Sequence, residues 1–206
     1  GEPPGLDLWI GLPEKEHARV AQMIAARAGC SDAEEEFTRA LADPGSLTRA
    51  AFAAPAGPLG ATAMNAPAVR SASLPSLGGI GSATALAKFY SMLANGGEWE
   101  GRRYFSGQAL GWMTTRLAQG PDRTLRTETA FSAGFMVDPV DADGRKKRRV
   151  FGPSLSAFGH PGAGGSLAFA DPENGLGFAY VMNQMETGVL PKARAIGLVQ
   201  ALYDCD

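Results

Sequence analysis

A turn signal at residues 171–175, Asp-Pro-Glu-Asn-Gly, separates two runs of strand-forming residues. Asp, Pro, Asn and Gly all favour a tight reversal of the backbone, so the runs 165–170 and 175–183 are predicted to pair as an antiparallel hairpin. A third run, 156–160, is expected to lie beside them. Because side chains alternate along a strand, one face of this sheet should hold Leu167, Phe169, Phe178 and Tyr180.

Apolar residues at helical spacing predict two helices in the middle of the chain. The clearer one spans 83–95: Ser82 can cap it, the sequence Asn-Gly-Gly at 95–97 can end it, and its apolar face carries Leu86, Phe89, Tyr90 and Leu93. The other is predicted over 107–118 with Ser106 as its cap, and its inward face is expected to carry Leu110, Met113, Thr114 and Leu117.

A terminal helix is predicted over 191–203, where Pro191 fits the first turn and one face carries Ile196, Val199 and Leu202. Helices in the middle, an antiparallel meander and a helix that covers it predict the α+β class, an antiparallel sheet with packed helices. The chain is expected to form a single domain over residues 1–206.

The remaining local patterns are weaker. Val20, Met23 and Ile24 recur at helical spacing within 14–28, and a short helix with Ser31 or Asp32 as its cap is predicted to run to Leu41. The apolar run 131–137 is predicted to be a strand.

Composition excludes several classes of protein. The 206 residues are 45% hydrophobic and 19% charged with a net charge of −2, so general disorder and an overall basic field for nucleic acid are excluded. No apolar run reaches the ~18 residues that a transmembrane segment needs. Cys30 and Cys205 are expected to be free thiols, with one terminal bridge as the alternative. His17 and His160 are too few for a multi-histidine metal site, and no metal or organic cofactor is expected.

Common nucleophile and phosphate-binding motifs do not occur in the sequence. Gly-x-Ser-x-Gly, Ser-x-x-Lys, Gly-x-Gly-x-x-Gly and Gly-x-x-x-x-Gly-Lys are all absent. The basic run 145–149 follows a turn signal at 141–144. Because the rest of the chain is acidic, this run is predicted to be a solvated hairpin arm beside Asp141 and Asp143 rather than a nucleic-acid patch.

The most informative stretch is 158–166, Phe-Gly-His-Pro-Gly-Ala-Gly-Gly-Ser. A histidine ends a predicted strand, and glycines that let another molecule approach the backbone closely follow it. Pro161 cannot donate to a strand ladder, so this strand is predicted to lie at a sheet edge. A titratable side chain beside bare backbone N–H groups suits an acyl-transfer site, and the alternative is a surface turn with an ordinary histidine.

Four segments that span nearly the whole chain carry a family resemblance. Residues 6–13, Leu-Asp-Leu-Trp-Ile-Gly-Leu-Pro, resemble a Pro-Leu-Gly-Leu-x-Asp-Thr-Trp passage, and residues 78–89 resemble a Gly-Gly-x-x-Ser-Thr-Ala-x-Asp-Leu-Ala-x-Phe helix start. Residues 160–162, His-Pro-Gly, resemble a Lys-Thr-Gly or His-Thr-Gly strand, and Asn183 resembles the end of a closing strand. In this order they resemble the C-terminal half of the serine β-lactamase and penicillin-binding-protein-like superfamily, above all the class C-like (family VIII) carboxylesterases.

The resemblance implies a serine hydrolase that forms an acyl-enzyme with a small-molecule acyl ester or amide. Its Ser-x-x-Lys and Tyr-x-Asn elements are expected in an N-terminal half upstream of Gly1, so this chain by itself should be inactive. The resemblance makes the N–H of Ala163 an oxyanion donor and His160 the polarising group of the site. It places in the substrate site Pro161, Gly162 and Asn183.

Two departures from the family pattern bear on the substrate. Pro161 replaces a hydroxyl that helps the lactamases bind a carboxylate, and His160 replaces a permanent cation with a largely neutral group, so neutral esters are favoured over anionic β-lactams. Other interpretations remain open. The chain could be a non-catalytic binding or scaffolding module that keeps the fold, and Asn183 could be a strand-end cap. A nucleotide-binding loop at 162–166 is disfavoured because no strand-loop-helix context follows it.

Overall fold

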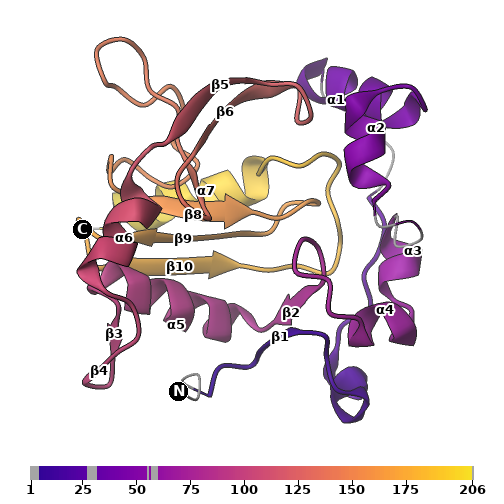
Figure 1. The fold of residues 1–206 in the computed structure, drawn as a ribbon, viewed down its shortest axis with the longest axis horizontal. Coiled ribbons are helices and arrows are strands. Elements are labelled where there is room, and N and C mark those ends of the chain that lie inside the picture. Colours follow the sequence, from indigo (N-terminus) through magenta and orange to yellow (C-terminus); the bar gives the residue numbers. More distant parts are fainter. Residues whose placement is uncertain (1–4, 27–31, 55, 57–59, 206) are drawn as a thin grey trace.

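The computed structural model describes residues 5–26, 32–54, 56 and 60–205 (Figure 1). At its centre lies an antiparallel sheet of six strands in the order β10-β9-β8-β7-β6-β5. The strands are β5 (Ala118–Asp122), β6 (Thr127–Phe131), β7 (Met136–Val137), β8 (Phe158–Pro161), β9 (Leu167–Asp171) and β10 (Leu176–Tyr180). Helices pack against this sheet, so the α+β class predicted from the sequence is confirmed.

The predicted hairpin is formed by β9 and β10, and β8 lies beside it as expected. Phe169 is opposite Phe178 and Leu167 is opposite Tyr180, so these four side chains share one face of the sheet. Both β8 and β9 begin two residues later than the sequence indicated, and β10 ends at Tyr180 rather than at residue 183.

The helices α5 (Ala83–Ala94) and α6 (Gly107–Thr114) cover one face of the sheet, and α7 (Ala193–Asp204) covers the other (Figure 1). The predicted caps are present, because the Ser82 hydroxyl accepts a hydrogen bond from Ala85 N and the Ser106 hydroxyl accepts one from Ala109 N, both at 3.1 Å. The apolar face of α5 packs as predicted, together with Phe158 and Ala168 of the sheet.

Helix α5 lies directly against β10, and a glycine makes this approach possible. A β-carbon at Gly177 would lie 2.1 Å from the backbone nitrogen of Ser91 in α5, which is closer than any side chain permits. Packing of this helix against the hairpin therefore fixes the face of the sheet on which the residues after β8 are presented.

The terminal helix α7 packs on the opposite face through buried Val199 and Ala195. It begins after Pro191, with Lys192 as its N-cap, so the prediction that Pro191 lies in the first turn is wrong. The Tyr203 hydroxyl donates to Asp171 Oδ2 at 2.5 Å, which links the helix to the β9–β10 turn.

Two predictions between residues 107 and 137 are wrong. Helix α6 ends at Thr114 instead of 118, and Leu117, predicted to face inward, is 65% exposed. The run 131–137 is two strands, because the chain turns at Ser132, whose N–H donates to Phe135 O at 2.9 Å. The residues after α6 form β5, which pairs with β6 in the sheet instead of continuing the helix. Such tertiary pairing is not encoded in the local spacing of apolar residues.

The N-terminal part of the chain contains short elements at the end of the sheet opposite α6 (Figure 1). They are β1 (Leu8–Ile10), a 3-10 helix η1 (Glu14–Arg19), α1 (Asp32–Ala42), α2 (Leu47–Phe52), α3 (Gly60–Met64), α4 (Pro67–Ser71) and β2 (Gly79–Gly81), which pairs with β1. A two-stranded ribbon of β3 (Glu98–Trp99) and β4 (Arg102–Arg103) follows α5.

The helix suggested within 14–28 is wrong for residues 20–26, because the chain extends after Arg19 and Ile24 forms a parallel bridge with Gln184, while residues 27 and 28 lie outside the described residues. Helix α1 occupies the predicted position, while its proposed cap Ser31 and the thiol of Cys30 lie outside the described residues. Cys205 is exposed. Among the described residues, none of the helices combines the length and the apolar character needed to cross a membrane.

The basic run 145–149 is only partly the solvated arm that the sequence predicted. The turn at 141–144 forms, with Gly144 N donating to Asp141 O at 3.1 Å. The side chain of Lys146, however, is only 5% exposed, and its Nζ lies 3.0 Å from Oδ2 of the buried Asp138. Burial lowers the pKa of this ammonium group, while the charge of Asp138 opposes that change.

Candidate functional site

The candidate site lies at the end of β8 that extends beyond the neighbouring strand β7. Strand β7 pairs only with Phe158 and Gly159, so His160 and Pro161 are paired with β9 alone. The prediction that Pro161 places the whole strand at a sheet edge is therefore wrong, since β8 is an inner strand. It is the end of the strand that is open on one side.

Backbone alternation explains why proline is tolerated at this position. Gly162 N donates to Ser166 O at 2.8 Å, so the Gly162 N–H faces β9. Successive backbone nitrogens in a strand face opposite sides. The nitrogen of Pro161 therefore faces away from β9, toward the side where β7 no longer extends. No ladder hydrogen bond is lost there.

Ala163 presents its backbone to this open side. The residue is exposed, and within the described part of the chain its N–H has no hydrogen-bond partner. An N–H group that is unpaired and held by a rigid backbone is the type of donor that stabilises an oxyanion in acyl transfer.

The loop that carries Ala163 is held from behind by the segment after β10. Glu186 N donates to Gly164 O at 2.7 Å, and Gly164 N donates to Gly188 O at 3.1 Å. Gly164 and Gly165 have φ values of +88° and +110°, which side-chain-bearing residues rarely adopt. These contacts and conformations fix the direction of the Ala163 N–H.

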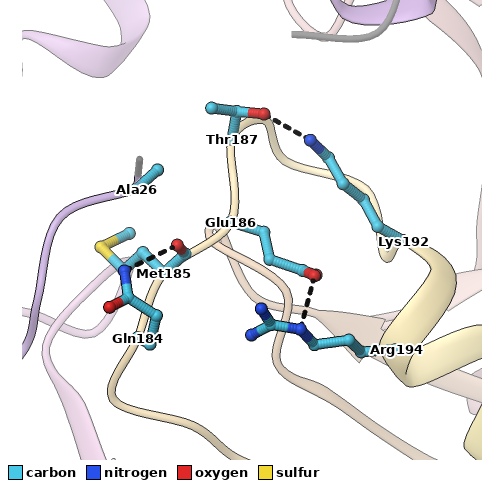
Figure 2. Close-up of a pocket in the computed structure, with 7 residues that line it drawn as sticks. All are labelled: Ala26, Gln184, Met185, Glu186, Thr187, Lys192 and Arg194. Atoms are coloured by element: carbon cyan, nitrogen blue, oxygen red, sulfur yellow. Dashed lines mark hydrogen bonds and ion pairs between the residues drawn. The ribbon is translucent and has the colours of Figure 1, made fainter. Parts of the chain in front are cut away.

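A small pocket of about 390 Å³ lies behind this loop, and Figure 2 shows the side chains that line it. Glu186 points toward Arg194, with Oε1 3.3 Å from Nε, and Lys192 bonds to the Thr187 hydroxyl. The other carboxylate oxygen of Glu186 is buried beside Gly165, without a hydrogen-bond partner among the described residues. Glu186 therefore packs against the loop at Gly164 and Gly165.

His160 is exposed, and its ring orientation is set by its own backbone. Nδ1 lies 2.7 Å from the carbonyl oxygen of Pro161. A carbonyl only accepts hydrogen bonds, so Nδ1 carries the proton and, in the neutral ring, Nε2 keeps its lone pair. The neutral side chain can thus accept a proton or a hydrogen bond at Nε2.

A cleft of about 1070 Å³ brings together every site residue predicted from the sequence, namely His160, Pro161, Gly162, Ala163 and Asn183. The cleft is also lined by apolar side chains, among them Leu86 and Phe89 of α5 and Phe135. The predicted site residues therefore share one large cleft with apolar side chains.

Asn183 lies beyond the end of β10, not within a strand as predicted. It lines the cleft, and its Nδ2 donates to Gln22 O at 3.2 Å. Gln184 Nε2 likewise donates to Ala25 O at 2.8 Å. Asn183 thus helps hold the extended segment that follows η1 against the cleft.

Sequence reasoning missed the charged group of the cleft. Arg19 bonds Asp7 Oδ2 at 2.5 Å and Glu16 Oε2 at 2.8 Å, and all three side chains line the cleft. The hydrogen bond from Arg19 lowers the pKa of Asp7 below its ordinary value. Among the described lining residues Arg19 is the one permanent cation, and two carboxylates neutralise it. From the sequence, only the Glu16–Arg19 ion pair could have been predicted, because residues three apart lie on the same side of a helix.

Comparison with known proteins gives consistent relationships. The Beta-lactamase family model matches residues 2–202. The chain is 36% identical, over 115 residues, to Esterase/beta-lactamase LipL of Mycobacterium tuberculosis (strain ATCC 25618 / H37Rv), a match that covers 55% of this chain and 24% of that protein.

Solved structures are similar over almost the whole chain. A family VIII carboxylesterase is 34% identical with a TM-score of 0.76, covering 97% of this chain and 47% of that one. A penicillin-binding protein homolog from Caulobacter crescentus is 34% identical with a TM-score of 0.75, covering 97% and 48%. The chain thus spans about half the length of these structures and about a quarter of LipL. With a family model that matches nearly all of its residues, the chain belongs to the beta-lactamase family.

Proposed function

We propose that residues 1–206 are the C-terminal portion of one domain of a serine carboxylesterase that cleaves acyl esters through an acyl-enzyme. The single observation that carries this proposal is the unpartnered N–H of Ala163, exposed on the same cleft as His160. This chain supplies the oxyanion and His-x-Gly wall. The esterase and β-lactamase relatives support serine hydrolase chemistry in general.

The nucleophile would come from an upstream half of the same protein. No serine in this chain is followed three residues later by lysine, and the chain covers about half of its solved relatives. The apolar side chains that line the cleft, among them Leu86, Phe89 and Phe135, offer a surface on which an apolar segment bearing that serine can pack. The isolated chain would then be catalytically incomplete.

The reaction follows from these positions. The upstream serine oxygen bonds to the ester carbonyl carbon, and the carbonyl oxygen becomes an oxyanion that accepts a hydrogen bond from Ala163 N–H. The alcohol leaves with the proton that the serine gave up. Water then cleaves the acyl-enzyme: its oxygen completes the carboxylic acid and one of its protons regenerates the serine hydroxyl, while Nε2 of His160 accepts a hydrogen bond within this proton network.

The charges of the cleft favour a neutral acyl group. Arg19 is neutralised by Asp7 and Glu16, and Pro161 brings no hydroxyl to the wall. A substrate carboxylate would therefore lose its water without gaining a free cation, which is unfavourable. Neutral esters avoid this cost.

The test compares p-nitrophenyl acetate with nitrocefin in the full-length protein. Wild type should hydrolyse the ester, and His160→Ala should lower that rate roughly ten- to a thousandfold because a group of the proton network is lost. His160→Lys should add little nitrocefin activity, and more should come from His160→Lys combined with Pro161→Thr, which adds a cation and a hydroxyl.

Two results would contradict the proposal. Wild-type turnover of nitrocefin that rivals turnover of the ester would show that the His-Pro pair does not favour neutral substrates. Absence of all hydrolysis by the folded full-length protein would instead favour a binding or scaffolding module that keeps the fold.

A further inference from the structure

Ser166 lies on the same face of the sheet as His160. In the register of β8 and β9, His160 is opposite Ala168, and beyond the strand end Gly162 N donates to Ser166 O at 2.8 Å. Because side chains alternate, His160 and Ser166 point to one face as diagonal neighbours, which in antiparallel sheets are roughly 7–8 Å apart. Both residues line the large cleft.

The Ser166 hydroxyl stands directly over Gly162. A β-carbon built on Gly162 would lie only 2.1 Å from Ser166 Oγ, so the hydroxyl occupies the place that a side chain at 162 would fill. The peptide bond that leaves Gly162 carries the N–H of Ala163. The hydroxyl and the candidate oxyanion donor are therefore adjacent.

The hydroxyl is also free to bind a ligand. Over the residues that the structure describes, Ser166 Oγ takes part in no hydrogen bond, whereas the hydroxyls of Ser82 and Ser106 cap helices and that of Ser154 bonds Asp171. Ser166 is half-buried at the cleft, so its O–H can be shielded from bulk water by a substrate.

We propose that Ser166 is a substrate-contacting residue whose O–H donates a hydrogen bond to the alkoxy oxygen of the ester, beside the carbonyl oxygen held by Ala163. The inference rests on the proposed function and narrows its substrate class to oxygen esters rather than thioesters, because thioether-type sulfur is a weak acceptor.

The hydrogen bond assists the step in which the alcohol leaves. When the tetrahedral intermediate collapses, the bond between the carbonyl carbon and the alkoxy oxygen breaks and its electron pair moves to that oxygen. The hydrogen bond from Ser166 stabilises this developing charge, and the proton first released by the upstream serine completes the alcohol. Ser166 keeps its own proton throughout.

The experiment uses the full-length protein and two matched substrates, ethyl butyrate and its thioester S-ethyl thiobutyrate, with acid release followed in a pH-stat. Ser166→Ala should lower kcat/KM for the oxygen ester roughly ten- to a hundredfold, the range of one hydrogen bond to a developing charge. The thioester should change less than about threefold, since its sulfur gains little from the donor. Ser166→Thr, which retains a hydroxyl, should recover most of the ester activity.

A structural control tests the placement of the hydroxyl without any assay of activity. Gly162→Ala should lower the melting temperature in wild type, because its β-carbon meets Ser166 Oγ, and should be better tolerated in a Ser166→Gly background. Equal destabilisation in the two backgrounds would overturn the placement.

The outcomes separate this inference from the proposed function. Ester activity unchanged in Ser166→Ala, or lowered equally for ester and thioester in a variant that melts like wild type, would overturn the inference and leave the esterase assignment intact. A folded wild-type protein that hydrolyses neither substrate would overturn the proposed function and this inference together.

Discussion

Ala163→Pro in the full-length protein is expected to lower kcat on p-nitrophenyl acetate roughly a hundred- to a thousandfold, which corresponds to ~2.7–4 kcal/mol of transition-state stabilisation. Proline has no N–H, so the substitution removes the one backbone donor that the exposed loop directs to the open side of β8. Ala163 does not adopt a positive φ, so the fixed negative φ of proline does not conflict with a left-handed backbone at this position.

A matched substitution separates the lost donor from other effects. Ala163→Gly retains the N–H and should keep kcat within about threefold of wild type, since only a methyl group is removed. Melting curves of both variants establish that the loop and sheet are intact. If Ala163→Pro were folded and turned over substrate at the wild-type rate, the oxyanion would have to be stabilised elsewhere.

Truncation of the chain before Pro191 is expected to remove several kcal/mol of unfolding free energy. The deletion exposes the sheet face covered by the buried Val199 and the partly buried Ile196 and Leu202, and full burial of one such side chain contributes ~1.5–3 kcal/mol. A typical domain has only ~5–15 kcal/mol in total, so the truncated protein should unfold at far lower urea concentration.

Tyr203→Phe provides a graded comparison for the truncation. It removes only the hydroxyl that donates to Asp171, so it should cost ~1.5–3 kcal/mol, the range for a hydrogen bond to a charged group. Urea denaturation followed by circular dichroism measures both changes. A truncated chain with the same midpoint as wild type would mean that α7 contributes nothing to the stability of the sheet.

Elements governed by neighbours along the chain could be predicted from the sequence. Helix α5 has its cap at Ser82, an apolar face at helical spacing and glycines at its end, and each signal acts within a few residues. The β9–β10 hairpin is similar, because its turn residues and alternating side chains specify both the reversal and the register.

Elements decided by distant partners could not be predicted. Residues 115–118 read as a continuation of α6, yet β6 pairs with the residues that follow and draws them into the sheet. Lys146 lies in a run of basic residues that the sequence predicted to be exposed, but it forms a buried ion pair with Asp138, eight residues away. The strand pairing and the ion pair both depend on which distant segments come into contact in the folded chain. The spacing of apolar residues along the sequence does not predict those contacts.

The candidate site shows the same division. His160, Gly162 and Ala163 occupy one short stretch with an unusual arrangement of glycines, so they could be singled out from the sequence. Ser166 in the same stretch was missed as a ligand contact, because its position over Gly162 depends on the tight turn between β8 and β9. The place of Arg19 and its two carboxylate partners in the cleft could not be predicted, because it depends on a fold that brings η1 to the cleft.

Labelling with a fluorophosphonate tests directly whether this chain supplies the oxyanion wall while another part of the protein supplies the nucleophile. The full-length protein and the 206-residue chain are treated in parallel, and the modified serine is mapped by mass spectrometry. One labelled serine is expected in the full-length protein, upstream of residue 1 and followed three residues later by lysine, and no label is expected on the 206-residue chain. Stoichiometric labelling of any serine within residues 1–206 would contradict this expectation.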